Sequence, residues 1–241
     1  MESPQLNAPR SDLPIIDDEL DLLDELLPLD GLRIVELGCG NARLLRDLLQ
    51  RHPLCEALAL EVDERQLAKN LAAPQERLQF SAGVAQAIPL ADAGFDLAMM
   101  LKSLHHVPMP LMAKALSEAA RVLRPGGHLY ISEPVYDGPL NEVVRLFNDE
   151  GVVRAAAQAA LDKALSQAAG PWETATERHF LARVGFVDFA DFEQRMMRPT
   201  FADHQLDDAK VAQVRTAFEP HMTSQGAHFV RPMHVRLLRR R

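Results

Sequence analysis

The chain has 241 residues and a formal net charge of −8; 47% of its residues are hydrophobic and 25% are charged. This size suits one α/β domain with a sizeable core, and the acidic balance argues against a general nucleic-acid binder. Two cysteines offer no disulfide framework, and no apolar run approaches the ~20 residues that a membrane span needs. We therefore expect a single cytoplasmic domain that contacts neither nucleic acid nor a membrane.

The first 30 residues predict a helical cap. Leucines recur at helical spacing from Leu20 to Leu27 on an acidic segment, and Pro28 ends the pattern.

Residues 33–43, with the sequence RIVELGCGNAR, predict a buried strand, a tight turn and the start of a helix. Glycine lets the backbone approach a ligand and adopt positive φ, and the helix N-terminus presents unpaired N–H groups. This combination indicates a nucleotide site at the carboxyl end of a strand. A dinucleotide fingerprint needs a third glycine where the chain has Arg43, which argues against NAD.

The ELGCG segment at residues 36–40 instead resembles motif I of the class I S-adenosylmethionine (SAM) methyltransferases. The resemblance implies that Glu36, Gly38, Cys39 and Gly40 bind the cofactor. The family usually has a further glycine where this chain has Ala42, which adds one methyl group near the cofactor.

A second apolar strand ends in acid at residues 58–63. Glu61 lies twenty-one residues after Gly40, close to the spacing at which an acid reaches ribose hydroxyls in nucleotide-binding α/β folds. The resemblance places the ribose on Glu61 and the cofactor beside Val62. Asp63 precedes a helical segment and is expected to be its N-cap.

Residues 78–90 resemble the third segment of the family. Where the family commonly has an aspartate that accepts a hydrogen bond from adenine, this chain has Val84. Val84 could pack on the adenine face, the backbone N–H of Ala85 could meet a ring nitrogen, and Gln86 could serve the amino group.

Two more segments complete the resemblance. Residues 94–108 resemble the FDLV…LHHVP stretch of the small-molecule methyltransferases, in which Leu101 ends the fourth strand and its carbonyl meets the methionine amino group. Residues 123–134 match the family's LRPGG turn and fifth strand.

Three side chains near these strand ends are candidate catalytic groups: His105, His106 and Glu133. An oxygen or nitrogen nucleophile can need a general base, and both histidines follow the fourth strand. The alternatives are that one histidine caps the loop while the other packs inside, and that Glu133 is an exposed strand-end acid. No metal ligands are expected.

The remaining chain departs from a minimal domain. Residues 135–175 and 199–228 predict insertions over the active site, with an alanine-rich helix at 155–169. Residues 176–184 resemble the family's helix before the sixth strand at 185–189, and the last strand is expected around residues 233–238. Ligands bind beyond the carboxyl ends of such strands, so the insertions should cover the cofactor, as suits small molecules.

We therefore expect a doubly wound, seven-stranded, mostly parallel sheet, with the last strand antiparallel and next to the fifth. The resemblance implies a SAM-dependent methyltransferase that releases S-adenosylhomocysteine (SAH) and methylates an O, N or C nucleophile of a small molecule, as a monomer or homodimer. The alternative is a methyltransferase-like binding or regulatory protein without methyl transfer. The basic tail at residues 236–241 gives weaker support to an RNA or protein substrate.

Overall fold

The computed structural model describes residues 12–200, 202 and 204–241. Residues 1–11 of the predicted cap, and residues 201 and 203 of the second predicted insertion, lie outside this range. The strands are β1 (Ile15–Ile16), β2 (Arg33–Leu37), β3 (Glu56–Glu61), β4 (Leu78–Ala82), β5 (Phe95–Leu101), β6 (Leu123–Pro134), β7 (Trp172–Phe186), β8 (Met222–Thr223) and β9 (Gly226–Arg240).

Helices connect and cover these strands. They are α1 (Glu19–Leu26), α2 (Arg43–Arg51), α3 (Glu64–Ala72), α4 (Met112–Val122), α5 (Pro139–Val144), α6 (Gly151–Ser166), α7 (Phe189–Phe192) and α8 (Asp208–Phe218). Short helical turns are η2 (Leu104–His106), η3 (Met109–Leu111), η4 (Glu193–Met197) and η5 (Glu219–His221). No helix within the described ranges combines the length and the apolarity needed to cross a bilayer.

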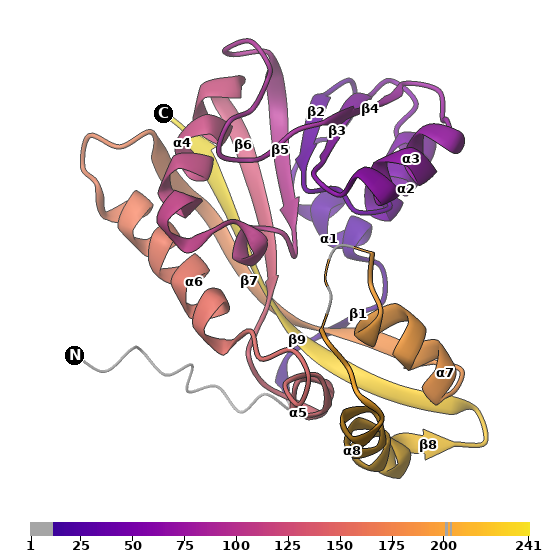
Figure 1. Ribbon diagram of the computed structural model, residues 1–241. Helices are drawn as coiled ribbons and strands as arrows, with labels where there is room; N and C mark the ends of the chain where they lie inside the picture. The colour runs from indigo at the N-terminus through magenta and orange to yellow at the C-terminus, as the bar shows by residue number, and fades with distance from the viewer. Residues whose placement is uncertain (1–11, 201, 203) are drawn as a thin grey trace.

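One sheet organises the molecule, in the order β1-β7-β9-β6-β5-β2-β3-β4 with β8 paired to β9 (Figure 1). Strands β2 to β6 are parallel to their neighbours within this group. Strand β9 is antiparallel to β6 and to β7, so the predicted place and direction of the last strand are confirmed. The doubly wound α/β architecture is confirmed as well.

Two short strands extend the sheet beyond the seven expected. Strand β1 pairs in parallel with β7 through Ile15 and Ile16, and β8 forms a small hairpin with β9. The Pro-Gly-Gly turn is an irregularity within β6, where the pairing moves from Phe95–Leu123 to Leu97–His128. Gly126 has a φ of +81° there, a conformation that glycine adopts without steric cost.

The prediction of a helix at residues 176–184 and a strand at 185–189 is wrong. Residues 172–186 form the single long strand β7, which pairs with β9 along its length. Its apolar residues fit either period over so short a span, and the continuous antiparallel partner decides the conformation. The alanine-rich helix α6 provides the crossover from β6 to β7.

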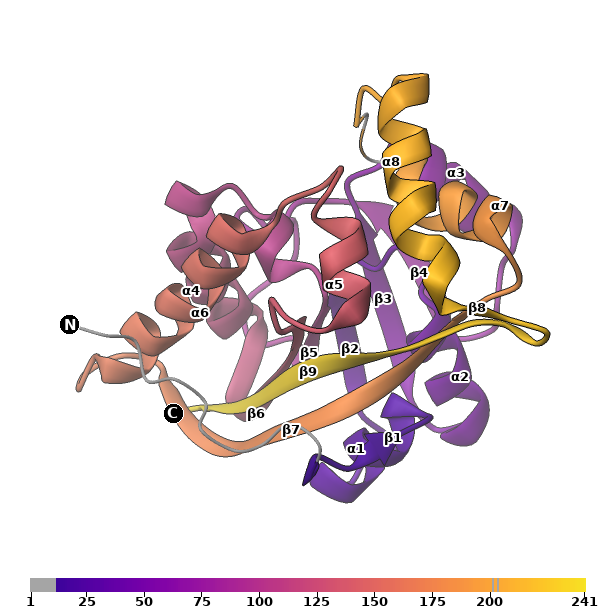
Figure 2. The same cartoon turned by 90° about the horizontal axis from the view of Figure 1, so that it is seen from below.

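Helices pack on both faces of the sheet (Figure 2). On one face, α1 and α2 bury Leu20, Leu23, Leu45 and Leu48 in one cluster with Tyr130. A second cluster joins α4 and α6 to the other face. Strands β7 and β9 continue past the sheet, where α5, α7 and α8 form a third, phenylalanine-rich cluster (Figure 1).

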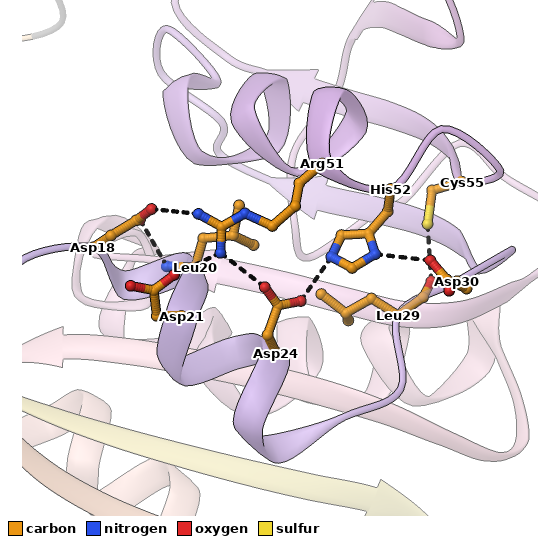
Figure 3. A network of polar contacts seen from close by, with 9 residues as sticks. All are labelled: Asp18, Leu20, Asp21, Asp24, Leu29, Asp30, Arg51, His52 and Cys55. Atoms are coloured by element: carbon orange, nitrogen blue, oxygen red, sulfur yellow. Dashed lines mark hydrogen bonds and ion pairs between the residues drawn. The ribbon is translucent and has the colours of Figure 1, made fainter.

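Helix α1 is tied to the end of α2 by a polar network (Figure 3). The Arg51 guanidinium lies 2.6 Å from Asp21 and 2.8 Å from Asp24. His52 contacts Asp24 at 2.7 Å and Asp30 at 2.8 Å through its two ring nitrogens. The acidic face of the predicted N-terminal helix therefore contacts the neighbouring helix through a set of partly exposed ion pairs.

Candidate functional site

The glycine turn lies where the winding direction of the sheet reverses. Strands β2 and β5 are neighbours, but the chain continues from β2 toward β3 and from β5 toward β6. Such a switch point leaves a crevice at the carboxyl ends of the two strands. Gly38 follows β2 with a φ of +75°, and a Cβ added to it would lie 3.0 Å from the Cβ of Ser103, just beyond β5.

Gly40 faces open space instead. Its φ is +55°, and a Cβ built on it would meet no described atom within 4 Å. Ala42, at the position of the missing family glycine, is buried and has a φ of +54°. Because L-residues other than glycine are strained there, the departure from the family motif leaves the turn in place at a conformational cost.

Glu61 lies against this turn. One carboxylate oxygen accepts the Gly40 N–H at 2.6 Å, and the other accepts the N–H groups of Val62 and Asp63, each at 2.8 Å. The Cys39 thiol also lies 3.9 Å from the oxygen that accepts from Gly40, and it is a weak donor that a ligand hydroxyl could replace. The side chain of Val62 is 65% exposed, and Asp63 caps α3 as expected by accepting from Arg65 N–H.

Glu36 is buried beneath the turn, 2% exposed, and its Oε2 has no hydrogen-bond partner among the described residues. Burial raises the pKa of Glu36 to about 8, although Lys102 acts in the opposite direction. Burial and the nearby carboxylates also raise the pKa of the Cys39 thiol. The Glu36 carboxyl is therefore suited to meet a positively charged or hydrogen-bond-donating ligand group.

The predicted adenine segment lies in a tight turn after β4. The Ala87 N–H donates to the Val84 carbonyl at 3.1 Å. Val84, Ala85 and Gln86 are each half-buried. Leu101 ends β5 and is also half-buried.

His105 and Glu133 meet in the interior. Glu133 accepts the Leu104 N–H at 2.9 Å through one oxygen and contacts His105 Nδ1 through the other. Glu133 is 2% exposed, which rules out the alternative of an exposed strand-end acid. A carboxylate on Nδ1 fixes the histidine orientation and leaves Nε2 facing Glu150, 3.8 Å away. The His106 ring lies 4.1 Å from the His105 ring, and burial together with His105 lowers the His106 pKa.

A cavity of about 170 Å³ opens beside this pair. Its walls come from the ends of β5 and β6, both predicted insertions and β9. The lining residues are Lys102, His105, His106, Pro134, Val135, Leu140, Asn141, Val144, Asn148, Glu150, Arg154, Arg195, Met196, Pro199, His204 and Arg231. The glycine turn adjoins it through Lys102 and Ser103, whose hydroxyl donates to the Leu37 carbonyl at 2.7 Å.

Residues from the second insertion also reach the ribose side of the turn. Thr200 lies near Asp63, and its polar side chain lowers the pKa of that carboxyl. Pro199, the preceding residue, lines the cavity. The segment around Thr200 therefore lies between the cavity and the end of β3.

Comparison with known proteins agrees with this geometry. A family model described as a methyltransferase domain matches residues 35–131. The 27-O-demethylrifamycin SV methyltransferase of Amycolatopsis mediterranei (strain S699) is 33% identical over 118 residues, which are 47% of this chain and 43% of that protein. The ubiquinone/menaquinone biosynthesis C-methyltransferase of Dinoroseobacter shibae (strain DSM 16493 / NCIMB 14021 / DFL 12) is 32% identical over 117 residues, 46% of each chain.

Residues 35–131 are therefore similar to the class I SAM-dependent methyltransferases. The chain matches less than half the length of these two relatives. A solved structure, a putative methyltransferase from Bacillus halodurans C-125, aligns with a TM-score of 0.63 and 16% identity over 92% of this chain and 98% of that one. At that identity the alignment shows the methyltransferase fold alone.

Sequence reasoning missed most of the cavity that this methyltransferase fold carries. Asn141, Arg154 and Arg231 come from α5, α6 and β9, and no local motif marks any of them. The one available signal was their common origin in segments beyond the carboxyl edge of the sheet.

The arginines of the basic tail bind groups of this chain itself. Arg236 contacts Asp162, Arg239 contacts Glu173, and Arg241 donates to the carbonyl of Gly170.

Two groups of side chains bring three possible metal ligands within 4.8 Å of one another: His105, His106 and Glu150, and Glu177, His179 and His234. Arg154 lies 2.5 Å from Glu150, and Arg236 lies 3.7 Å from Glu177. Because a cation already accompanies each carboxylate, neither group is well suited to a second one.

Proposed function

We propose that the protein is a SAM-dependent methyltransferase of small-molecule acceptors. The observation that carries this proposal is that the glycine turn and the cavity beside His105 lie next to each other at the switch point of the sheet. The glycine turn lies against Ser103, and the turn that follows presents His105 to the neighbouring cavity. The similarity to O- and C-methyltransferases of small molecules supports the same reaction class.

The residues of the turn fit the cofactor. Gly40 leaves open space where a side chain would otherwise stand, and the unpartnered oxygen of Glu36 suits an ammonium group. Ribose hydroxyls would bind Glu61 in place of the weak Cys39 thiol donor. Val62, Val84, Ala85 and the Leu101 carbonyl would complete the binding surface. When bound, SAM supplies a methyl group on a sulfonium, which is already a strong electrophile.

The protein's own task is to orient the acceptor, exclude water and remove a proton where the nucleophile carries one. Orientation can supply several kcal/mol of the barrier. His105 Nε2 faces the cavity and can accept the proton of a hydroxyl as the new bond to carbon forms. Glu133 holds the ring through Nδ1 and balances the charge that His105 gains. Both insertions contribute to the cavity walls, which limits access of water.

Calorimetric titration with SAH tests the proposal. Wild type should bind SAH, and Glu61→Ala should weaken binding by about 1–3 kcal/mol because it removes a charge-assisted acceptor. Asp63→Asn is the matched control, since asparagine preserves the helix cap, and its affinity should stay within about twofold.

Transfer of radioactive methyl from labelled SAM to fractions of a small-molecule extract then tests the reaction. SAH binding without transfer to any fraction would favour a binding or regulatory protein on the same fold. Absence of SAH binding by the folded wild type would overturn the proposal.

A further inference from the structure

The cavity contains two buried donors without acceptors. Arg231 Nε and Asn141 Nδ2 are each buried and make no hydrogen bond among the described residues. Asn141 as a whole is 8% exposed, and both residues line the same cavity. Because a buried donor left unpaired costs about 1–3 kcal/mol, two of them around one space indicate that a ligand supplies the acceptors.

Arg231 lies on β9 beyond the point where the neighbouring strand β6 ends. Strand β6 ends at Pro134, which pairs with Met233 of β9, so Arg231 lies on the part of β9 that continues past the end of β6. Burial and the positive charge of Arg154 lower the pKa of Arg231, although the carboxylates of Glu19 and Glu150 act in the opposite direction. Within the described part of the chain, no carboxylate lies within ion-pair distance of this guanidinium.

The other cations of the cavity have partners. Arg154 lies 2.5 Å from Glu150 and donates to Asn141 Oδ1 at 3.2 Å. Lys102 lies 3.9 Å from Glu19. The Arg154 bond also turns the amide of Asn141, so that its oxygen is occupied and its NH₂ group is free. Arg154 and Lys102 are thus each accompanied by a carboxylate, whereas the Arg231 guanidinium, among the described residues, is not.

We propose that Arg231 and Asn141 bind a carboxylate group of the methyl acceptor. This rests on the proposed function and names the substrate class: a small monocarboxylic acid whose nucleophile reaches His105. The planar guanidinium matches a carboxylate, one negative charge balances the one unpaired cation, and the Asn141 amide adds a neutral donor. The aliphatic side chains of Leu140 and Val144 line the cavity as well and would contact the acceptor's carbon skeleton.

Binding of neutral and charged probes of equal shape tests this inference. The probes are benzoate against benzamide and propionate against propionamide, each titrated into the protein in the presence of SAH. Each carboxylate should bind at least about tenfold more tightly than its amide. Arg231→Gln should abolish this preference and leave SAH affinity within about twofold.

Arg195→Gln is the matched control. Arg195 lines the same cavity, but its side chain is 50% exposed and pairs with Asp191 at 2.9 Å. This variant should keep the preference for carboxylates.

A melting experiment without any probe separates a ligand-binding role from a structural one. Removal of an unpaired buried charge should leave the melting temperature of Arg231→Gln equal to or above that of wild type. A fall of more than about 5 °C would show that the guanidinium stabilises the fold and would overturn the inference.

Two further outcomes would overturn it while leaving the proposed function intact: SAH binds but neither carboxylate binds at about 10 mM, or Arg231→Gln retains the preference. If the folded wild type does not bind SAH, the proposed function fails instead.

Discussion

His105 Nδ1 and the Glu133 carboxylate are joined by a hydrogen bond between the turn after β5 and the end of β6. The same carboxylate accepts the backbone N–H of Leu104, so Glu133 fixes both the ring and the turn that carries it. The opposite ring nitrogen is thereby turned toward the cavity and Glu150.

We expect His105→Asn to lower methyl transfer by about 10²- to 10⁴-fold, the usual contribution of a general base. SAH affinity should change by less than about twofold, because the histidine acts on the acceptor. The measurement is transfer from labelled SAM to an acceptor found in the extract fractions, alongside SAH calorimetry. His106→Asn provides the comparison and should retain most of the rate, because the Glu133 carboxylate orients the ring of His105. Equal losses of rate in both variants would show that His105 is not the general base.

Gly40→Ala should weaken SAH binding strongly, because its new methyl group would point into the open space beside the turn. Gly31→Ala is the matched control. Gly31 also has positive φ and no atom within 4 Å of an added Cβ, but it lies before β2. Both variants should lose a similar conformational stability of about 1 kcal/mol, measured by urea denaturation, while only Gly40→Ala should lose SAH affinity. Similar SAH affinities in the two variants would place the cofactor elsewhere.

Glu36 should make the ligand-free protein less stable as the pH rises. Its pKa is raised from 4.5 to about 8 in the folded chain, so the folded state binds more protons than the unfolded state between these values. The free energy of unfolding should therefore be greatest below pH 4.5 for this group and fall as the pH rises toward 8, by at most about 5 kcal/mol. Glu36→Gln should remove this part of the slope. The comparison is urea denaturation of both proteins at several pH values, and parallel curves would contradict it.

Val84→Asp should maintain or increase SAH affinity, because a carboxylate at this position can accept from the adenine amino group. In a fold whose cofactor site is filled or collapsed, the same change would bury an unpaired charge and lower the melting temperature. SAH calorimetry with thermal melts of both proteins distinguishes the two. A strongly lowered melting point without SAH binding by wild type would support the non-enzymatic alternative.

Local chemistry made much of the fold predictable. The apolar run before Gly38, the glycines of the turn and the acid at Glu61 belong to one short unit whose strand, turn and helix depend on neighbours in sequence. Asp63 was recognisable as an N-cap for the same reason. The order of such units resembles that of the methyltransferase family, and this resemblance predicted the sheet topology, including the antiparallel last strand.

The errors arose where distant partners decide the structure. Residues 176–184 form a strand because β9 provides a continuous partner, and their own periodicity does not show this. Arg231 and Asn141 lie 90 residues apart in the sequence and share a cavity only because β9 returns beside β6. Neither residue type is informative alone, since most arginines and asparagines lie on exposed surfaces.

Helix α1 limits how far this protein can be truncated from its N-terminus. The recognisable methyltransferase segment starts at residue 35, but Leu20 and Leu23 are completely buried in the core that α2 shares. Each contributes about 1.5–3 kcal/mol of burial free energy, a large part of the stability of an ordinary domain. A fragment trimmed to the boundary of detectable homology would therefore expose an apolar groove along α2 and precipitate. The unit that folds is larger than the unit that comparison recognises, and exchange of domains between relatives should be made outside residue 18.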